Sequence, residues 1–134
     1  MKVILDTNVF VSGVFFSGPP YRILEAWREG ELELIMSSDI LDEYRRVATV
    51  LAEGFPPVDL RGILEFVEKE AVFFDAPALS EQICDDPDDD KFLACAFASD
   101  SKIIVSGDKH LLRVSGYRDI EVLKPKAFVD AYLT

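Results

Sequence analysis

Residues 2–8 read KVILDTN: a short apolar run that ends abruptly in an aspartate, a threonine and an asparagine. A continuous apolar run of this length is typical of a strand buried on both faces of a parallel sheet. The same pattern returns at residues 103–108, IIVSGD. Because ligands bind at the carboxyl ends of the strands in such sheets, Asp6 and Asp108 are the first candidate site residues.

Strands and helices alternate along the rest of the chain. Further strands are predicted at 34–36, 71–74 and 120–123, and helices at 19–29, 38–51, 59–69, 91–99 and from Pro125 onward, with short helical turns at 9–12 and 110–113. Ser38 is the expected N-cap of the second helix, and residues 54–57, GFPP, should end it. This order implies right-handed crossovers. It predicts an α/β fold of three layers, α/β/α, around a central, mainly parallel sheet.

Length and composition favour one domain over residues 1–134. Of the 134 residues, 49% are hydrophobic, which is enough to build a core. No apolar run approaches the ~20 residues that a membrane helix needs, and Met1 leads straight into the first strand without a charged leader. We therefore expect a cytoplasmic protein that is not in a membrane. Cys84 and Cys95 are expected to be reduced thiols without a function.

The formal net charge of −11 argues at first against a polyanionic partner. The charge is unevenly distributed, however, and residues 91–126 contain more basic than acidic side chains. If RNA binds, this segment is the predicted docking surface, with Lys91, Lys109, Arg113 and Lys124 along it.

Four acids have positions that stability alone does not readily explain: Asp6, Glu43, Asp90 and Asp108. Glu43 shares the inward face of its helix, and Asp90 stands where a helix starts. Each also has a simpler explanation, as a helix cap, a turn residue or, for Glu43, a side chain that reaches solvent. Helical phase does not choose between Asp89 and Asp90, and His110 is interpreted as an exposed turn residue.

Oxygen ligands without cysteine or several histidines suit a hard cation such as Mg²⁺ or Mn²⁺. Hydrolysis of a phosphodiester by metal-activated water needs mainly positioning and charge neutralisation from the protein. A cage of carboxylates is therefore chemically sufficient for a nuclease.

Four segments together resemble the PIN-domain family, and they cover nearly the whole chain in order: LDTN at 5–8, DILDEY at 39–44, DPDDDKFL at 86–93 and VSGD at 105–108. The resemblance implies a PilT N-terminus-like α/β/α fold and a ribonuclease that uses Mg²⁺ or Mn²⁺. By motif position, Asp6, Glu43, Asp90 and Asp108 carry over as catalytic, metal-binding acids. Asn8 and Ser106 carry over as supporting residues, and Asp89 as a possible fifth acid.

The DPDDDKFL and SGDKHLL segments further resemble the branch of the family that contains VapC-like toxins of prokaryotic toxin–antitoxin pairs. That resemblance implies an RNA substrate, a homodimer and an antitoxin protein as partner. Family membership alone leaves open an RNA-processing nuclease that is not a toxin.

Two other hypotheses compete with the nuclease. A PIN-like scaffold without nuclease activity would bind partners only, but the presence of all four motif acids weighs against it. A phosphotransfer domain would use Asp6 as phosphate acceptor. Phosphatases of that kind usually carry a second aspartate two residues later, where this chain has Asn8, and a receiver domain would have its acids in another order.

Overall fold

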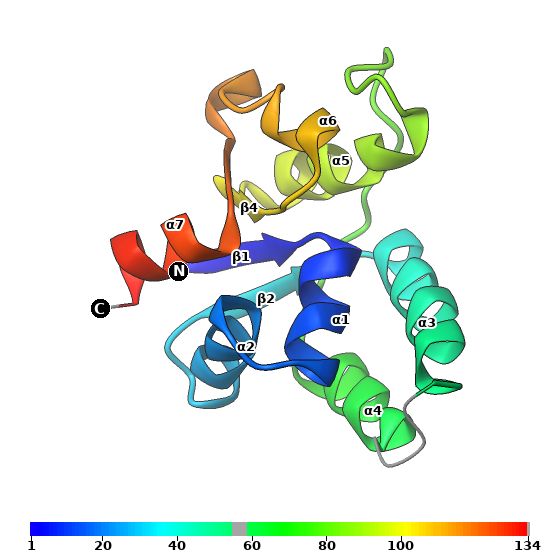
Figure 1. Cartoon of the computed structure of the whole chain (residues 1–134). Coiled ribbons are helices and arrows are strands. Elements are labelled where there is room, and N and C mark those ends of the chain that lie inside the picture. Colours follow the sequence, from blue (N-terminus) through cyan, green and yellow to red (C-terminus); the bar gives the residue numbers. More distant parts are fainter. Residues whose placement is uncertain (55–58, 134) are drawn as a thin grey trace.

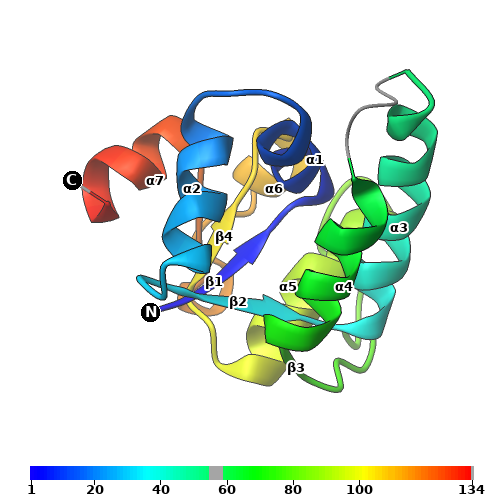
Figure 2. The ribbon, with the colours of Figure 1, turned by 90° about the horizontal axis from the view of Figure 1, so that it is seen from below.

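A computed structural model of the chain describes residues 1–54 and 59–133. Its centre is a parallel sheet with the strand order β3-β2-β1-β4-β5 (Figure 1). The strands are β1 (Lys2–Leu5), β2 (Glu33–Met36), β3 (Val72–Phe73), β4 (Ile103–Val105) and β5 (Glu121–Leu123). Helices α2 and α7 lie on one side of these strands and α5 lies on the other (Figure 2). The predicted three-layer α/β/α fold is confirmed.

Helices fill the connections between the strands, and one more follows the last strand. They are α1 (Thr7–Phe15), α2 (Pro19–Arg28), α3 (Ser38–Ala52), α4 (Leu60–Glu70), α5 (Asp90–Ser99), α6 (Lys109–Leu112) and α7 (Pro125–Tyr132), with 3₁₀ turns η1 (Pro87–Asp89) and η2 (Tyr117–Asp119). No helix in the described part of the chain is long and apolar enough to cross a membrane.

Three local predictions need correction or qualification. The short turn expected at residues 9–12 is a nine-residue helix, α1, which packs against α2 and α3. The N-cap of α3 is Ser37, not Ser38, because the Ser37 hydroxyl accepts a hydrogen bond from the Ile40 backbone N–H at 3.3 Å. The break expected at residues 54–57 lies almost wholly outside the described residues, and α3 itself ends at Ala52.

The core holds the site end of the sheet in place. The central strands are buried on both faces, with Ile4, Leu5 and Ile104 fully inaccessible, as expected for a parallel sheet covered by helices. Tyr44 of α3 stacks on Phe10 of α1 with a centroid distance of 4.3 Å, and its hydroxyl donates to the Leu5 carbonyl at 2.5 Å. These contacts fix α1 and α3 against the end of β1.

Candidate functional site

The carboxyl ends of β1 and β4 bring two of the predicted acids to one edge of the sheet. Leu5 pairs with Val105, so Asp6 and Ser106 follow neighbouring strands directly. The Ser106 hydroxyl donates to Asp6 Oδ2 at 2.7 Å and accepts from the Asp108 backbone N–H at 2.9 Å. Ser106 therefore links the two segments that carry Asp6 and Asp108.

Asp6 is a buried carboxylate in a region of negative charge. Only 5% of the residue is accessible to solvent. Burial raises the pKa of its carboxyl group, the hydrogen bond from Ser106 lowers it, and the charges of Asp108 and Glu43 raise it again. The net shift of the pKa is upward, which indicates that a positive charge nearby would stabilise the ionised form.

Asp89, the last residue of η1, joins this region from a third segment of the chain. The pKa of its carboxyl group is raised to about 6, mainly by burial and also by the charges of Asp108, Asp86 and Asp6. Its Oδ2 atom is buried and makes no hydrogen bond within the described residues. A buried carboxylate oxygen without a donor is unusual and calls for a ligand or another explanation.

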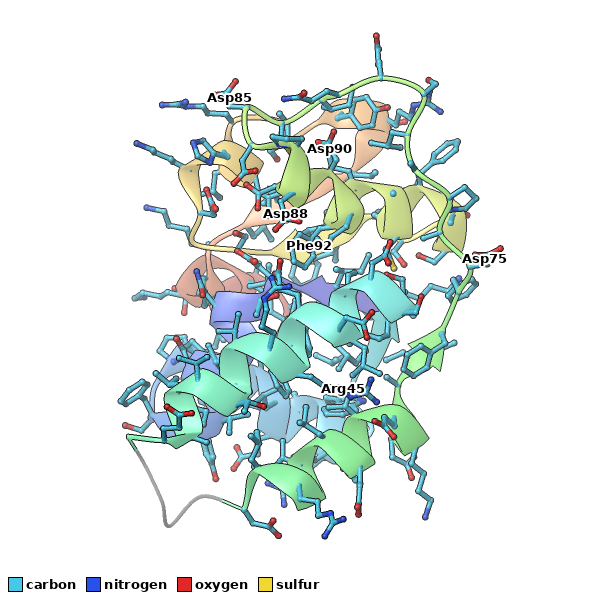
Figure 3. The ribbon with its side chains drawn as sticks, turned by 90° about the vertical axis from the view of Figure 1, so that its right-hand side faces the viewer. Arg45, Asp75, Asp85, Asp88, Asp90 and Phe92 are labelled. Carbon is cyan, nitrogen blue, oxygen red and sulfur yellow. The ribbon has the colours of Figure 1, made fainter. Side chains whose placement is uncertain are left out.

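Asp90 makes a different set of contacts. Its two carboxylate oxygens accept hydrogen bonds from the backbone N–H groups of Ile83 and Cys84, at 2.9 and 2.7 Å. The residue begins α5, next to the loop that precedes η1 (Figure 3). Asp90 thus holds this loop against the start of α5.

Glu43 lies close enough to affect Asp6, but both of its carboxylate oxygens have partners. Thr7 donates its hydroxyl proton to Oε2, and the Lys91 ammonium lies 2.7 Å from Oε1. Lys91 also pairs with Asp88 at 3.0 Å. The side chain of Lys91, predicted to contact substrate, therefore forms an ion-pair bridge between α3 and α5.

The remaining predicted residues differ in exposure and in ion pairing. Asn8 is exposed on the first turn of α1, and its neighbour Thr7 is the residue that contacts Glu43. Arg113 pairs with Asp85 at 3.1 Å, whereas Lys109 and Lys124 are exposed. The structure does not gather the four basic residues into one patch of unpaired charge.

Sequence reasoning set His110 aside, but the structure places it beside the acids. Its Nδ1 atom lies 3.5 Å from Asp108 Oδ1 and 3.6 Å from Asp89 Oδ2. Asp86, Asp89 and His110 each offer a ligand atom within 4.8 Å of the others. The position of His110, two residues after Asp108, is the sequence feature that could have predicted this proximity.

Two candidate ligand sets include Asp89, and within the described residues only the set of Asp86, Asp89 and His110 has its ligand atoms within 4.8 Å of one another. The all-oxygen set of Asp6, Asp89 and Asp108 suits Mg²⁺ or Mn²⁺, and imidazole in the second set suits softer metals such as zinc. We favour the oxygen set, because the pKa values of Asp6 and Asp89 are both raised and the charge of Asp108 contributes to both increases. We call Asp6, Asp89 and Asp108 the acid cluster, and its carboxylate oxygens are the ligand type that a hard divalent cation prefers.

A groove of about 620 Å³ lies between α3, α5 and residues 76–82, and its lining includes Asp88 and Asp90, the two neighbours of Asp89 in the chain. We call it the Glu43 groove. Its walls include Glu43 and Arg46 from α3, and Asp90 and Lys91 from α5. The groove provides room for a substrate close to the segment that carries Asp89.

Comparisons with known proteins identify the family. Residues 2–110 match the PIN domain family. The chain is 28% identical over 144 residues to the uncharacterized protein MJ1680 of Methanocaldococcus jannaschii, which covers 98% of this chain and 92% of that protein. The fold is similar to that in the crystal structure of VapBC2 from Rickettsia felis bound to a DNA fragment from their promoter, with a TM-score of 0.56 and 15% identity over 92% of this chain and 98% of that one. This chain belongs to the PIN domain family.

Proposed function

We propose that the protein is a divalent-metal-dependent ribonuclease. The observation that supports this most is the convergence of Asp6, Asp89 and Asp108 from three segments, with the buried Asp89 Oδ2 lacking a donor among the described residues. Carboxylates placed this closely repel one another unless a cation or a proton joins them. Membership of the PIN domain family supports the same interpretation.

In this proposal Asp6, Asp89 and Asp108 hold Mg²⁺ or Mn²⁺, and Asp89 takes the role that sequence reasoning gave to Asp90. When bound, the cation supplies the positive charge that an attacking water and a phosphodiester require. Ser106 orients Asp6 through the hydrogen bond at 2.7 Å. Glu43, held by Thr7 and Lys91, adds negative charge without an unpaired oxygen.

We further propose that the protein is the toxin component of a toxin–antitoxin pair in the cytoplasm, acting as a homodimer and inhibited by an antitoxin protein. The motif resemblance and the fold likeness to a VapBC2 complex support this step. Induced expression of the wild-type chain in a bacterial host should arrest growth, whereas Asp89→Asn should not. Normal growth with soluble wild-type protein would argue for an RNA-processing role instead.

The neighbouring residues Asp89 and Asp90 offer a matched test of the site. Purified wild-type protein, Asp89→Asn and Asp90→Asn are incubated with a mixed single-stranded RNA pool in Mn²⁺, Mg²⁺ or EDTA. We expect wild-type cleavage that requires metal and at least about 100-fold slower cleavage by Asp89→Asn, because one cation ligand is lost. Asp90→Asn should keep most of the activity at temperatures where this variant is folded, because Asp90 holds a loop and is not a ligand in this proposal.

The outcomes separate the hypotheses. Equal cleavage by wild type and Asp89→Asn would mean contamination or a site without Asp89. If folded Asp90→Asn lost cleavage and Asp89→Asn kept it, the metal ligand would be Asp90, as the sequence predicted. No cleavage by any of the three, together with measurable RNA binding, would support a PIN-like scaffold.

A further inference from the structure

A second hollow lies next to the Glu43 groove, along α5. It has a volume of about 290 Å³ and is bordered by residues 77–80, by Phe97 and Ala98 of α5, and by Tyr117 and Arg118 of η2. We call it the Phe97 slot. The slot and the Glu43 groove share four lining residues, Ala78, Leu79, Ser80 and Ala94. The two hollows are therefore adjacent on the surface.

One side of the slot is made of flat side chains. Phe97 exposes 53% of its surface although it is a large apolar residue. The Arg118 guanidinium carbon lies 4.4 Å from the centre of the Phe97 ring and 5.5 Å from that of Tyr117. A guanidinium at these distances is attracted by the ring faces, so the three side chains form one aromatic and cationic surface.

The backbone conformation of η2 is unusual for the residues that it holds. Arg118 and Asp119 have φ angles of 48° and 63°, in the left-handed region. This region is unfavourable for residues other than glycine. The fold nevertheless presents an arginine there, with its guanidinium over Phe97.

We propose that the Phe97 slot binds a nucleobase of single-stranded RNA next to the cleaved phosphodiester. This inference rests on the proposed ribonuclease function and adds a subsite to it. Bases of single-stranded RNA are recognised by stacking on aromatic rings and on arginine guanidinium planes, which are the groups present here. Pockets for drug-sized ligands have volumes of ~300–1,000 Å³. The slot is slightly smaller than this range, which suits a ligand the size of a single base.

The position of the slot fits a neighbouring nucleotide. Asp90 and Phe97 stand at positions one and eight of α5. With a rise of 1.5 Å per residue, Phe97 lies about 10 Å along the helix axis from the acid-cluster end. A base in the slot would thus belong to a nucleotide close to the bond that is cut, and the polynucleotide between them would lie in the Glu43 groove.

The test measures RNA binding in EDTA and RNA cleavage in Mn²⁺ with the full chain. The binding probes are fluorescent oligo(A) and oligo(U), followed by anisotropy at several low salt concentrations. Phe97→Ala removes the stacking face, and Phe97→Trp keeps it. Arg118→Gly removes the guanidinium and also relieves the left-handed backbone, so the variant should fold.

Two control variants change similar groups elsewhere. Tyr132→Ala removes a half-exposed aromatic side chain from α7, and Arg61→Ala removes an exposed positive charge from α4. Neither residue lines the slot or the groove. Thermal unfolding of every variant checks that the chain is folded at the assay temperature.

We expect Phe97→Ala to bind RNA roughly 5- to 150-fold more weakly, the range that loss of one base–aromatic stack produces. The salt dependence of binding should stay unchanged, because no phosphate contact is lost. Phe97→Trp should bind like wild type, Arg118→Gly should bind more weakly, and the two controls should be unaffected.

Contrary results have distinct meanings. If wild type binds and cleaves RNA and folded Phe97→Ala binds RNA equally well, the Phe97 slot does not bind a base. The proposed nuclease function would be unaffected by that result. If RNA binding by Arg118→Gly depended less on salt while Phe97→Ala bound like wild type, Arg118 would contact a phosphate and no base would stack on Phe97. That result would also overturn the proposed base site. Wild-type protein that neither binds nor cleaves RNA would refute the proposed function, and the slot with it.

Discussion

Asp89 and Asp90 are adjacent in the chain, yet their carboxylates have opposite surroundings. Asp90 accepts two backbone hydrogen bonds, from Ile83 and Cys84. Asp89 has a buried oxygen without a donor in the described residues and is close to other acids. Helical spacing could not separate the two, because η1 ends and α5 begins between them. The difference arises from where the loop before η1 runs, and that is a tertiary feature.

Asp89 should make stability depend on pH. Its pKa is about 6 in the folded state, against the ordinary aspartate value of 3.8. Between these values the folded state binds more protons than the unfolded state, so stability falls as pH rises from about 4 to about 6. In EDTA at neutral pH, Asp89→Asn should therefore be more stable than wild type by about 1–3 kcal/mol, and the difference should vanish near pH 4. Urea unfolding across this range measures it. A difference independent of pH would contradict the raised pKa.

Ser106 should affect both stability and metal binding. Ser106→Ala removes the hydroxyl that donates to Asp6 and accepts from the Asp108 N–H, and both partners are left without it. We expect a loss of about 1–3 kcal/mol in the free energy of unfolding. Binding of Mn²⁺, measured by calorimetry, should weaken as well, because the pKa of Asp6 rises further without this hydrogen bond.

Ser115→Ala is the matched control for this serine. Its hydroxyl accepts from the Val122 N–H at 2.9 Å, away from the acids. The control should lose stability without changing Mn²⁺ affinity. If Ser106→Ala bound Mn²⁺ as tightly as wild type, Asp6 would not be a ligand that depends on Ser106.

At the level of elements, α1 shows how packing outweighs local preference. Its sequence, TNVFVSGVF, is rich in β-branched residues and phenylalanine, which are not strong helix formers. The helix is stabilised instead by burial, since Val9, Phe10 and Val11 are all in the core. The helix starts directly after Asp6, so the packing of α1 also positions the first acid.

Gly13 permits the close approach of α1 and α2. A Cβ atom at this position would lie 2.6 Å from Leu24 Cδ1 and 2.8 Å from the Pro20 carbonyl oxygen. Although alanine is the better helix former, Gly13→Ala should destabilise the protein by about 1–3 kcal/mol through overpacking. Chemical denaturation measures the change. An increase in stability would mean that α2 can move away without cost.

The whole molecule carries a net charge of −11, so its acidic side chains repel one another and destabilise the folded state. Added NaCl should raise the unfolding temperature by screening this repulsion. MgCl₂ at the same ionic strength should raise it further in wild type, because an ion that binds only the folded state stabilises it. The additional increase should be absent in Asp89→Asn. Equal effects of the two salts on wild type would argue against a specific cation site.

The order of apolar runs and polar strand ends was sufficient to predict a parallel α/β/α fold and to place Asp6 and Asp108 at one edge of the sheet. These features follow from local periodicity and from the general rule for strand ends. Only the tertiary structure separated Asp89 from Asp90, paired Lys91 with Glu43, and brought His110 and Thr7 to the acids. The same holds for the Phe97 slot, whose walls come from residues 77–80, α5 and η2. Such contacts depend on how distant segments pack, and burial and charge at one residue are set by neighbours that the local sequence does not specify.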